Sequence, residues 1–274
     1  MKPCTPEAAA KSGICLYRSL SALLWRDQRL SLGEHRLFFL ADGLRFPYRR
    51  SPAQTIGEEN RKLLSTLFSR LGIAYHYQAG PVEELDKLLK PLRRGRSLLL
   101  YTHVDALPYD RSGALRGNAF HCIRVDRYEK GLLTFTDDFV PNPRGGYTTR
   151  TDTMEWRASR AYFTGLLWLE EGQGGKPQDA FSTVFFKNLK AFQSGGRQGK
   201  GYYGAAALSR LAQDVRQRRV WERTQRWYLE LAAMLKYQWY AAFHYLILAA
   251  GELGLLTGPP ADDLSGRQCF VCFP

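Results

Sequence analysis

Cys15 is the residue of this sequence whose position best suits covalent chemistry. It follows Ser12-Gly13-Ile14 and opens a predicted amphipathic helix, whose apolar stripe comprises Leu16, Leu20, Leu23 and Leu24. At a helix N-terminus, the unpaired N–H groups and the positive end of the dipole favour a thiolate and can hold an oxyanion. Cysteine is also a common small core residue, so this position leaves a nucleophilic and a structural role open.

A predicted hairpin brings a histidine and a carboxylate together. Residues 120–126 and 132–137 alternate between apolar and polar side chains, and the Tyr128-Glu129-Lys130-Gly131 segment between them predicts a turn. In an antiparallel hairpin, the residue numbers of every facing pair add to the same sum. If that sum is even, odd-numbered residues face odd-numbered residues, so they lie together on one face of the hairpin. Sums of 258 and 260 both place His121 opposite or diagonal to Asp137, within hydrogen-bond reach.

Asp138 is the alternative partner for the imidazole. An odd sum would pair His121 with Asp138, but it would divide the apolar side chains of the hairpin between two faces. We therefore expect Asp137 to orient His121. Together with a cysteine at a helix start, this is the arrangement of a Cys-His-Asp triad. A surface histidine beside an acidic loop is the other interpretation of the same residues.

The elements that must position these residues predict an α+β protein. Thr55-Ile56-Gly57-Glu58 matches a capping box, which predicts a helix that ends before Gly72. A strand over 73–78, a helix over 81–92 with Pro81 at its first position, and a strand over 97–104 are expected next.

The composition changes after the glycine-rich segment 172–177. Residues 205–256 contain few Gly or Pro and carry Leu, Ala, Trp and Tyr at helical spacing, which predicts two packed helices. We expect a first, α+β domain over residues 1–172 and a mostly helical domain with a tail over 177–274. The segment 195–201 also contains several glycines and a lysine. It lacks the preceding strand and the following Ser/Thr of a P-loop and is expected to be a loop.

The charge of the chain points to an acidic partner. Its 274 residues include 39 Lys and Arg against 26 Asp and Glu, a formal net charge of +13. The sequence has no zinc-finger spacing, RNP motif or basic heptads, so the charge does not by itself indicate nucleic acid. The basic cluster Arg216, Arg218, Arg219, Arg223 and Arg226 is a candidate docking surface, or a solvated helix face.

The number of cysteines and the first residues of the chain indicate the cellular compartment that we expect for this protein. The five cysteines are an odd number, and residues 1–6 have no apolar segment of the kind that opens a signal peptide. We expect a cytoplasmic protein with no membrane partner. Cys269 and Cys272 have the spacing of half a zinc site, but no second pair completes it, so no metal is expected.

Several short motifs occur in a recognisable order. They are Gly13-Ile14-Cys15 and the segments over 38–46 (FFLADGLRF), 104–109 (VDALPY), 120–125 (FHCIRV) and 133–137 (LTFTD). This order resembles the butirosin biosynthesis protein H family. The resemblance implies a papain-like cysteine-protease fold for the N-terminal domain and the family's helical C-terminal domain from about Tyr202. The chain departs from the family where Ile14 replaces a frequent histidine and where Asp137-Asp138 replaces Asp-Pro.

The resemblance also implies an activity. It implies an acyltransferase of specialised-metabolite biosynthesis, such as antibiotic biosynthesis, that moves an acyl group from a carrier-protein thioester to an amine. Cys15 would be the nucleophile, His121 the general base and Asp137 its orienting carboxylate. The partners are then an acidic acyl or peptidyl carrier protein and a small amine. The phosphopantetheine belongs to the carrier, so no cofactor of the chain's own is expected. Asp105 and Tyr109 are candidate substrate-binding residues of the cleft, or structural residues.

Three other functions fit the same residues. A cysteine peptidase or amide hydrolase would use the triad with water as acceptor, and a chain-releasing cyclase would use an amine of the bound chain itself. A non-catalytic basic binding protein would keep the papain-like shell without needing Cys15.

Overall fold

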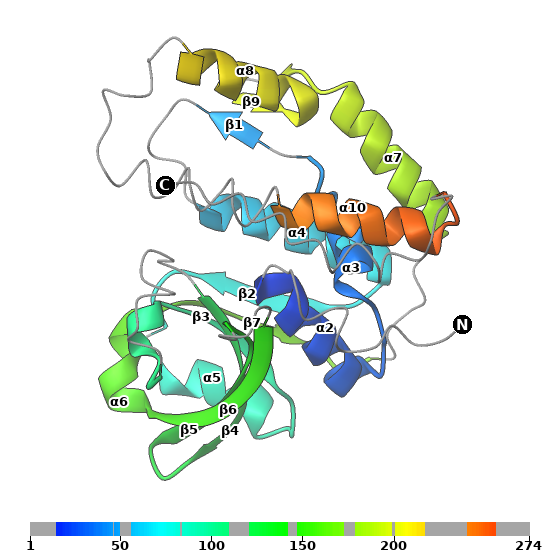
Figure 1. Cartoon of the computed structure of the whole chain (residues 1–274). Helices are drawn as coiled ribbons and strands as arrows, with labels where there is room; N and C mark the ends of the chain where they lie inside the picture. Colours follow the sequence, from blue (N-terminus) through cyan, green and yellow to red (C-terminus); the bar gives the residue numbers. More distant parts are fainter. Residues whose placement is uncertain are drawn as a thin grey trace.

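Figure 1 shows the computed structural model of this chain, which describes residues 15–45, 47–49, 56–82, 84–109, 121–141, 147–172, 179–198, 201–216 and 240–255. For residues 47–49, 56–60, 141, 198, 214–216 and 240–241 it describes the backbone alone.

The apolar runs of the sequence become the strands of one antiparallel sheet. These strands are β2 (Tyr75–Ala79), β3 (Leu98–Thr102), β4 (His121–Glu129), β5 (Leu132–Pro141), β6 (Tyr147–Glu155) and β7 (Phe163–Leu169). Their order in the sheet is β2-β7-β3-β4-β5-β6, and all neighbours are antiparallel. All five residues of β3 are buried, as expected for an uninterrupted apolar strand that is covered on both faces.

Helices cover the sheet and extend beyond it. They are α2 (Cys15–Gln28), α3 (Glu34–Leu40), α4 (Ile56–Leu71), α5 (Leu85–Leu92), α6 (Trp156–Ser159), α7 (Phe181–Gln193), α8 (Gly204–Arg216) and α10 (Tyr240–Glu252), with 3-10 turns η1 (Val104–Ala106) and η2 (Arg160–Tyr162). A small second sheet contains β1 (Pro47–Arg49), β8 (Arg197–Gln198) and β9 (Gly201–Tyr203) in the order β1-β9-β8.

The two faces of the main sheet belong to two hydrophobic clusters. In Figure 1 the strands curve around α5, and α2 lies on the other side, next to α3, α4 and α10. Leu100, Ile123 and Phe135 belong to the cluster on the side of α5. Leu99 and Cys122, their neighbours of opposite parity, belong to the cluster on the side of α2. The alternation of side chains along a strand therefore determines which core each residue enters.

The C-terminal helices share the cluster on the side of α2. The Tyr245 ring of α10 lies 5.2 Å from the Phe38 ring, and its hydroxyl donates to Glu34 at 2.7 Å. The Phe185 ring of α7 lies 5.0 Å from that of Phe39. Helices on both sides of the expected boundary at 172–177 thus bury their apolar faces together, and the division into two domains stays a prediction.

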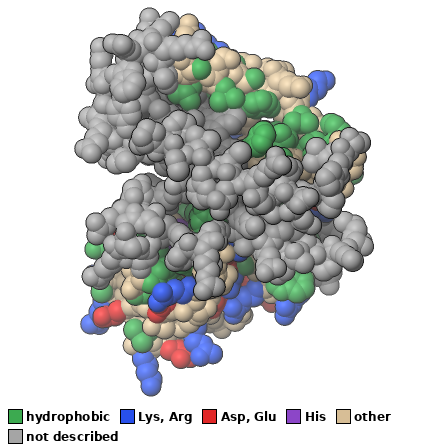
Figure 2. All heavy atoms as spheres, in the orientation of Figure 1, with side chains coloured by type: hydrophobic (Ala, Val, Ile, Leu, Met, Phe, Trp, Pro, Cys, Tyr) green, Lys and Arg blue, Asp and Glu red, His purple; other side chains and the backbone are tan. Residues whose placement is uncertain are grey.

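On the face shown in Figure 2, hydrophobic side chains gather over α7 and α8, whereas most charged side chains lie over the strands. No helix of the described residues is long and apolar enough to cross a membrane.

Most predicted elements are present. The helix expected from Pro81 begins only at Leu85, because Gly80 and Val82 still donate backbone hydrogen bonds to Thr164 and Phe163, which extends the pairing of β2 with β7. The sequence analysis did not predict α3, α7, β6 or β7. Helices α8 and α10 lie in the region 205–256 where two helices were expected, but residues 217–239 between them lie outside the described residues. Helix α10 packs on α3.

Adjacent phenylalanines of α7 provide a test of the shared core. Phe185 is 1% exposed and Phe186 is 51% exposed. We expect Phe185→Ala to lower the free energy of unfolding by about 3–5 kcal/mol, because it removes a ring packed against α3. Phe186→Ala should cost less than about 1 kcal/mol. Urea denaturation followed by circular dichroism measures both, and equal effects would contradict the packing of α7 described here.

Candidate active site

Cys15 is the first residue of α2, as the sequence predicts, and its side chain is half-buried. The helix buries Leu16, Leu20 and further apolar residues against the sheet, which fixes its axis over β4 and β5. The Ser19 hydroxyl donates to the backbone carbonyl of Cys122 at 3.2 Å and ties the first turns of the helix to β4. The first-turn N–H groups of a helix have no intrahelical acceptor, so Cys15 lies next to unsatisfied donors.

His121 and Asp137 are in direct contact. His121 opens β4 and is 3% exposed, and Asp137 lies within β5 and is fully buried. The Nε2 atom of His121 is 2.7 Å from Oδ2 of Asp137. Cys15 lies close enough to His121 for its thiol to contribute to the raised pKa of the ring. The structure thus brings together the three residues that the sequence analysis selected.

A β-bulge determines which aspartate meets the histidine. Near the turn, facing residues of β4 and β5 add to 261, as in Tyr128 with Leu133. Beyond the bulge between Val125 and Arg127 they add to 260, as in Val125 with Phe135. The even register continues towards His121 and places it diagonal to Asp137. The sequence analysis assumed one register for the whole hairpin; the sum of 260 that it considered applies on the side of the site, and an odd sum of 261 applies near the turn.

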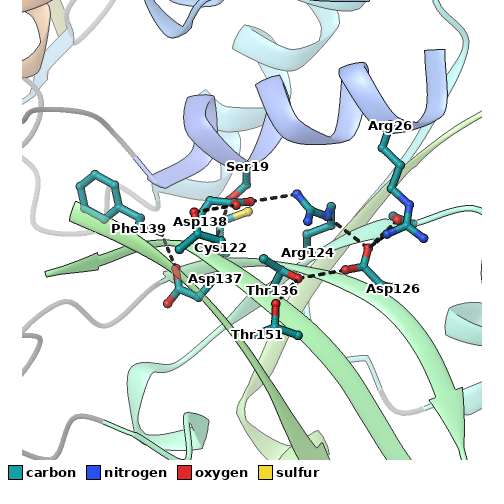
Figure 3. Close-up of polar contacts among 12 residues, drawn as sticks. Ser19, Arg26, Cys122, Arg124, Asp126, Thr136, Asp137, Asp138, Phe139 and Thr151 are labelled. Atoms are coloured by element: carbon teal, nitrogen blue, oxygen red, sulfur yellow. Dashed lines mark hydrogen bonds and ion pairs between the residues drawn. The ribbon is translucent and has the colours of Figure 1, made fainter. Parts of the chain in front are cut away.

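Asp138 points to the opposite face and has other partners. It accepts a hydrogen bond from Nη1 of Arg124 at 3.0 Å, while Arg124 Nε contacts Asp126 at 3.2 Å. Figure 3 shows Asp137 directed towards the Phe139 backbone and Asp138 directed towards Arg124 beneath α2. Burial raises the pKa of Asp138, although Arg124 opposes this effect. Asp138 therefore belongs to a network between α2 and the sheet.

Asp137 is held from three directions. Besides His121, the Tyr109 hydroxyl donates to Oδ2, and the Phe139 N–H donates to Oδ1 at 2.8 Å. The guanidinium of Arg150 lies over the Tyr109 ring, 4.3 Å from its centre. Tyr109 was expected either to line a substrate cleft or to be structural; its buried hydroxyl donates to the Asp137 carboxylate, and a role in substrate binding stays a prediction. The sequence signal for this contact was weak, because Tyr109 and Asp137 are 28 positions apart.

Of the other site residues expected from the sequence, Asp105 does not join this cluster. Asp105 lies in η1 on the surface, where its carboxylate is 3.0 Å from Nδ1 of His103. Arg216 ends α8 and only its backbone is described. Arg218, Arg219, Arg223 and Arg226, like Cys269 and Cys272, lie outside the described residues. Among the described part of the chain, no group of three or more His, Cys, Asp or Glu could hold a metal ion.

The contacts favour the charged forms of both buried partners. Burial alone would lower the pKa of His121, but the Asp137 carboxylate and the contact with Cys15 outweigh it and raise the pKa above 6.5. Burial alone would raise the pKa of Asp137, but the charge of His121 and the hydrogen bonds from His121, Tyr109 and Phe139 hold it below 3.8. An imidazolium–carboxylate pair beside a cysteine is the arrangement that results.

Comparison with known proteins gives a limited result. No protein-family model and no curated protein matches this chain. The crystal structure of a proposed C39-like peptidase from Bacillus anthracis is 13% identical in sequence, with 58% of this chain and 89% of that chain aligned, at a TM-score of 0.34. A likeness at this TM-score assigns neither the fold nor an activity. The described residues form helices and an antiparallel sheet, and they bring Cys15, His121 and Asp137 together.

The pH dependence of stability tests the pair. His121, with its raised pKa, stabilises the fold below pH 6.5, and this contribution is lost as the pH rises. Asp137, with its lowered pKa, stabilises the fold above pH 3.8, and this contribution is lost as the pH falls. We expect Asp137→Asn to cost about 3 kcal/mol between these values and less at higher pH. Urea denaturation across this pH range measures the difference.

Asp138→Asn is the matched control for this substitution. An NMR titration of the His121 ring should show a lowered pKa in Asp137→Asn and a much smaller change in Asp138→Asn, because only Asp137 contacts the ring. A larger shift in Asp138→Asn would contradict the register described here.

Proposed function

We propose that this chain is a papain-like cysteine acyltransferase that forms an acyl-Cys15 intermediate and transfers the acyl group to an amine. The observation that carries the proposal is the position of His121, whose Nε2 is 2.7 Å from Asp137 and whose pKa the nearby Cys15 thiol helps to raise. Nucleophile, base and orienting carboxylate within hydrogen-bond reach of one another are the signature of covalent acyl transfer.

The steps follow from this geometry. The Cys15 thiolate attacks the thioester carbonyl, and first-turn N–H groups of α2 stabilise the oxyanion of the tetrahedral intermediate. The bond to the donor sulfur breaks, and the departing thiolate takes a proton from the His121 imidazolium. An amine then attacks acyl-Cys15 and gives its proton to His121, the new amide leaves, and the thiolate–imidazolium pair returns.

Asp137 maintains the ring of His121 through both steps. Its bond to Nε2 fixes the orientation of the ring and stabilises the imidazolium. Tyr109 and the Phe139 N–H occupy further acceptor sites of the same carboxylate, so they act as positioning residues. Because thioesters are activated acyl donors, this chemistry requires no ATP.

The proposed donor and acceptor rest on the sequence resemblance and on the charge of the chain, since the contacts of the triad suit a transferase and a hydrolase equally. The resemblance to the butirosin biosynthesis protein H family supports a carrier-protein thioester as donor, and the net charge of +13 complements an acidic carrier.

Intact-protein mass spectrometry tests the nucleophile. After incubation with a panel of acyl-pantetheine thioesters, the wild type should gain the mass of one acyl group and Cys15→Ala should gain none. Cys122→Ala is the matched control, because this buried thiol takes no part in the proposed chemistry and its variant should still be labelled. Peptide mapping then locates the acyl group.

The fate of the adduct separates the possible functions. Release as an amide when amines are added supports the transferase, and release only as the free acid supports a hydrolase. Labelling of Cys15→Ala, or no labelling of a folded wild type by any thioester, would contradict the proposed nucleophile and leave a binding role.

Charge reversal tests carrier docking. We expect the combined Arg218→Glu, Arg219→Glu and Arg223→Glu variant to raise KM for an acyl-carrier protein by at least about tenfold, since it removes electrostatic steering. KM for the small acyl-pantetheine should stay unchanged. Steady-state kinetics at low and high salt measures both donors, and an equal effect on both would contradict a docking role for these arginines.

A further inference from the structure

A second site is formed by residues that the proposed chemistry does not use. A cavity of about 360 Å³ lies between the end of α3, the α7 helix and the β8–β9 hairpin. Its described lining comprises Asp42, Arg45, Lys187, Asn188, Ala191, Gly196, Arg197, Tyr203 and Gly204. The volume falls within the range of about 300–1,000 Å³ that small-molecule sites occupy.

The lining is cationic. Arg45, Lys187 and Arg197 face a single acidic residue, Asp42, among the described lining residues. The carboxylate of Asp42 is itself 2.8 Å from Nη1 of Arg70, which comes from α4 and is not part of the lining. The charge of Asp42 is therefore balanced by Arg70 from outside the lining.

Packing fixes the walls of this cavity. Nδ2 of Asn188 donates to the Phe39 carbonyl at 3.0 Å and to Asp42 at 3.3 Å, which holds Asp42 against α7. The guanidinium of Arg45 lies 5.2 Å from the centre of the Tyr203 ring. A Cβ atom at Gly195 would collide with the Tyr203 carbonyl, so glycine lets the hairpin approach α7. Residues 195–201, which were expected to form a loop, thus contain residues of the short strands β8 and β9, and this hairpin forms one wall of the cavity.

We propose that this cavity binds the phosphate group of a small phosphate monoester. A phosphate dianion needs more than one cation, and arginine forks match its oxygens geometrically. A carboxylate would be satisfied by a single arginine. The remaining volume, beside the Tyr203 ring and Ala191, accommodates the organic part of the ligand. The exposed head groups of Arg45, Lys187 and Arg197 are reachable from solvent.

Isothermal titration calorimetry with glycerol 3-phosphate and inorganic phosphate tests this site. We expect saturable binding of both probes to the full chain, and Lys187→Ala and Arg197→Ala should each weaken it by about tenfold. Lys190→Ala is the matched control, because this lysine lies on the same helix outside the described lining and should change the affinity by less than about twofold.

Several results would overturn the proposal. They are no binding of either phosphate probe, equal weakening by Lys190→Ala, and equal binding of acetate at the same ionic strength. Binding of a short DNA duplex without binding of glycerol 3-phosphate would also do so. The proposal is independent of the acyltransferase, because Lys187→Ala should leave the acylation of Cys15 unchanged.

Discussion

The register of β4 against β5 changes at Asp126, and the contacts of the His121 ring depend on this change. Asp126 accepts hydrogen bonds from Arg26 of α2 at 2.6 Å, from the Ser97 hydroxyl at 2.7 Å and from Thr136 of β5 at 3.0 Å. These contacts, several of which Figure 3 shows, connect the bulge to a helix and to both neighbouring strands. An odd register continued to the strand end would turn Asp138, and not Asp137, towards His121.

Residues of both hydrophobic clusters hold the proposed triad. Cys15 packs against the cluster that α2, α3 and the C-terminal helices form, whereas Tyr109, which holds Asp137, belongs to the cluster around α5. A change in either core therefore alters the distance between thiol and imidazole. Effects of about one ångström on such distances are large in covalent catalysis. Because the thiol–imidazole distance depends on the packing of both clusters, three catalytic side chains require the sheet and the helices on both of its faces.

The C-terminal helices contribute to this scaffold through polar as well as apolar contacts. Glu34 accepts a hydrogen bond from the Tyr245 hydroxyl. Burial raises the pKa of Glu34 to about 7, although the hydrogen bond from Tyr245 and the charge of Arg18 oppose this rise. His35 contacts Glu252 at 2.7 Å at the other end of α10. These contacts place α10 on the short helix that ends at the phosphate-binding cavity proposed above. The two proposed sites thus share α3 as a structural support, with different residues in each.

Local pattern alone determined the start of α2 at Cys15, the strands of the hairpin and the shared face of His121 and Asp137, because helical and strand periodicity are properties of short segments. The bulge, the Tyr109 hydroxyl on Asp137 and the cavity between α3, α7 and β8–β9 were decided by the tertiary structure. The Tyr109–Asp137 contact joins residues 28 positions apart, the Asn188–Phe39 contact beside the cavity joins residues 149 apart, and Asp126 at the bulge is bonded to Arg26, 100 positions away. Side-chain contacts over such separations depend on how the elements pack, and no local spacing in the sequence encodes them.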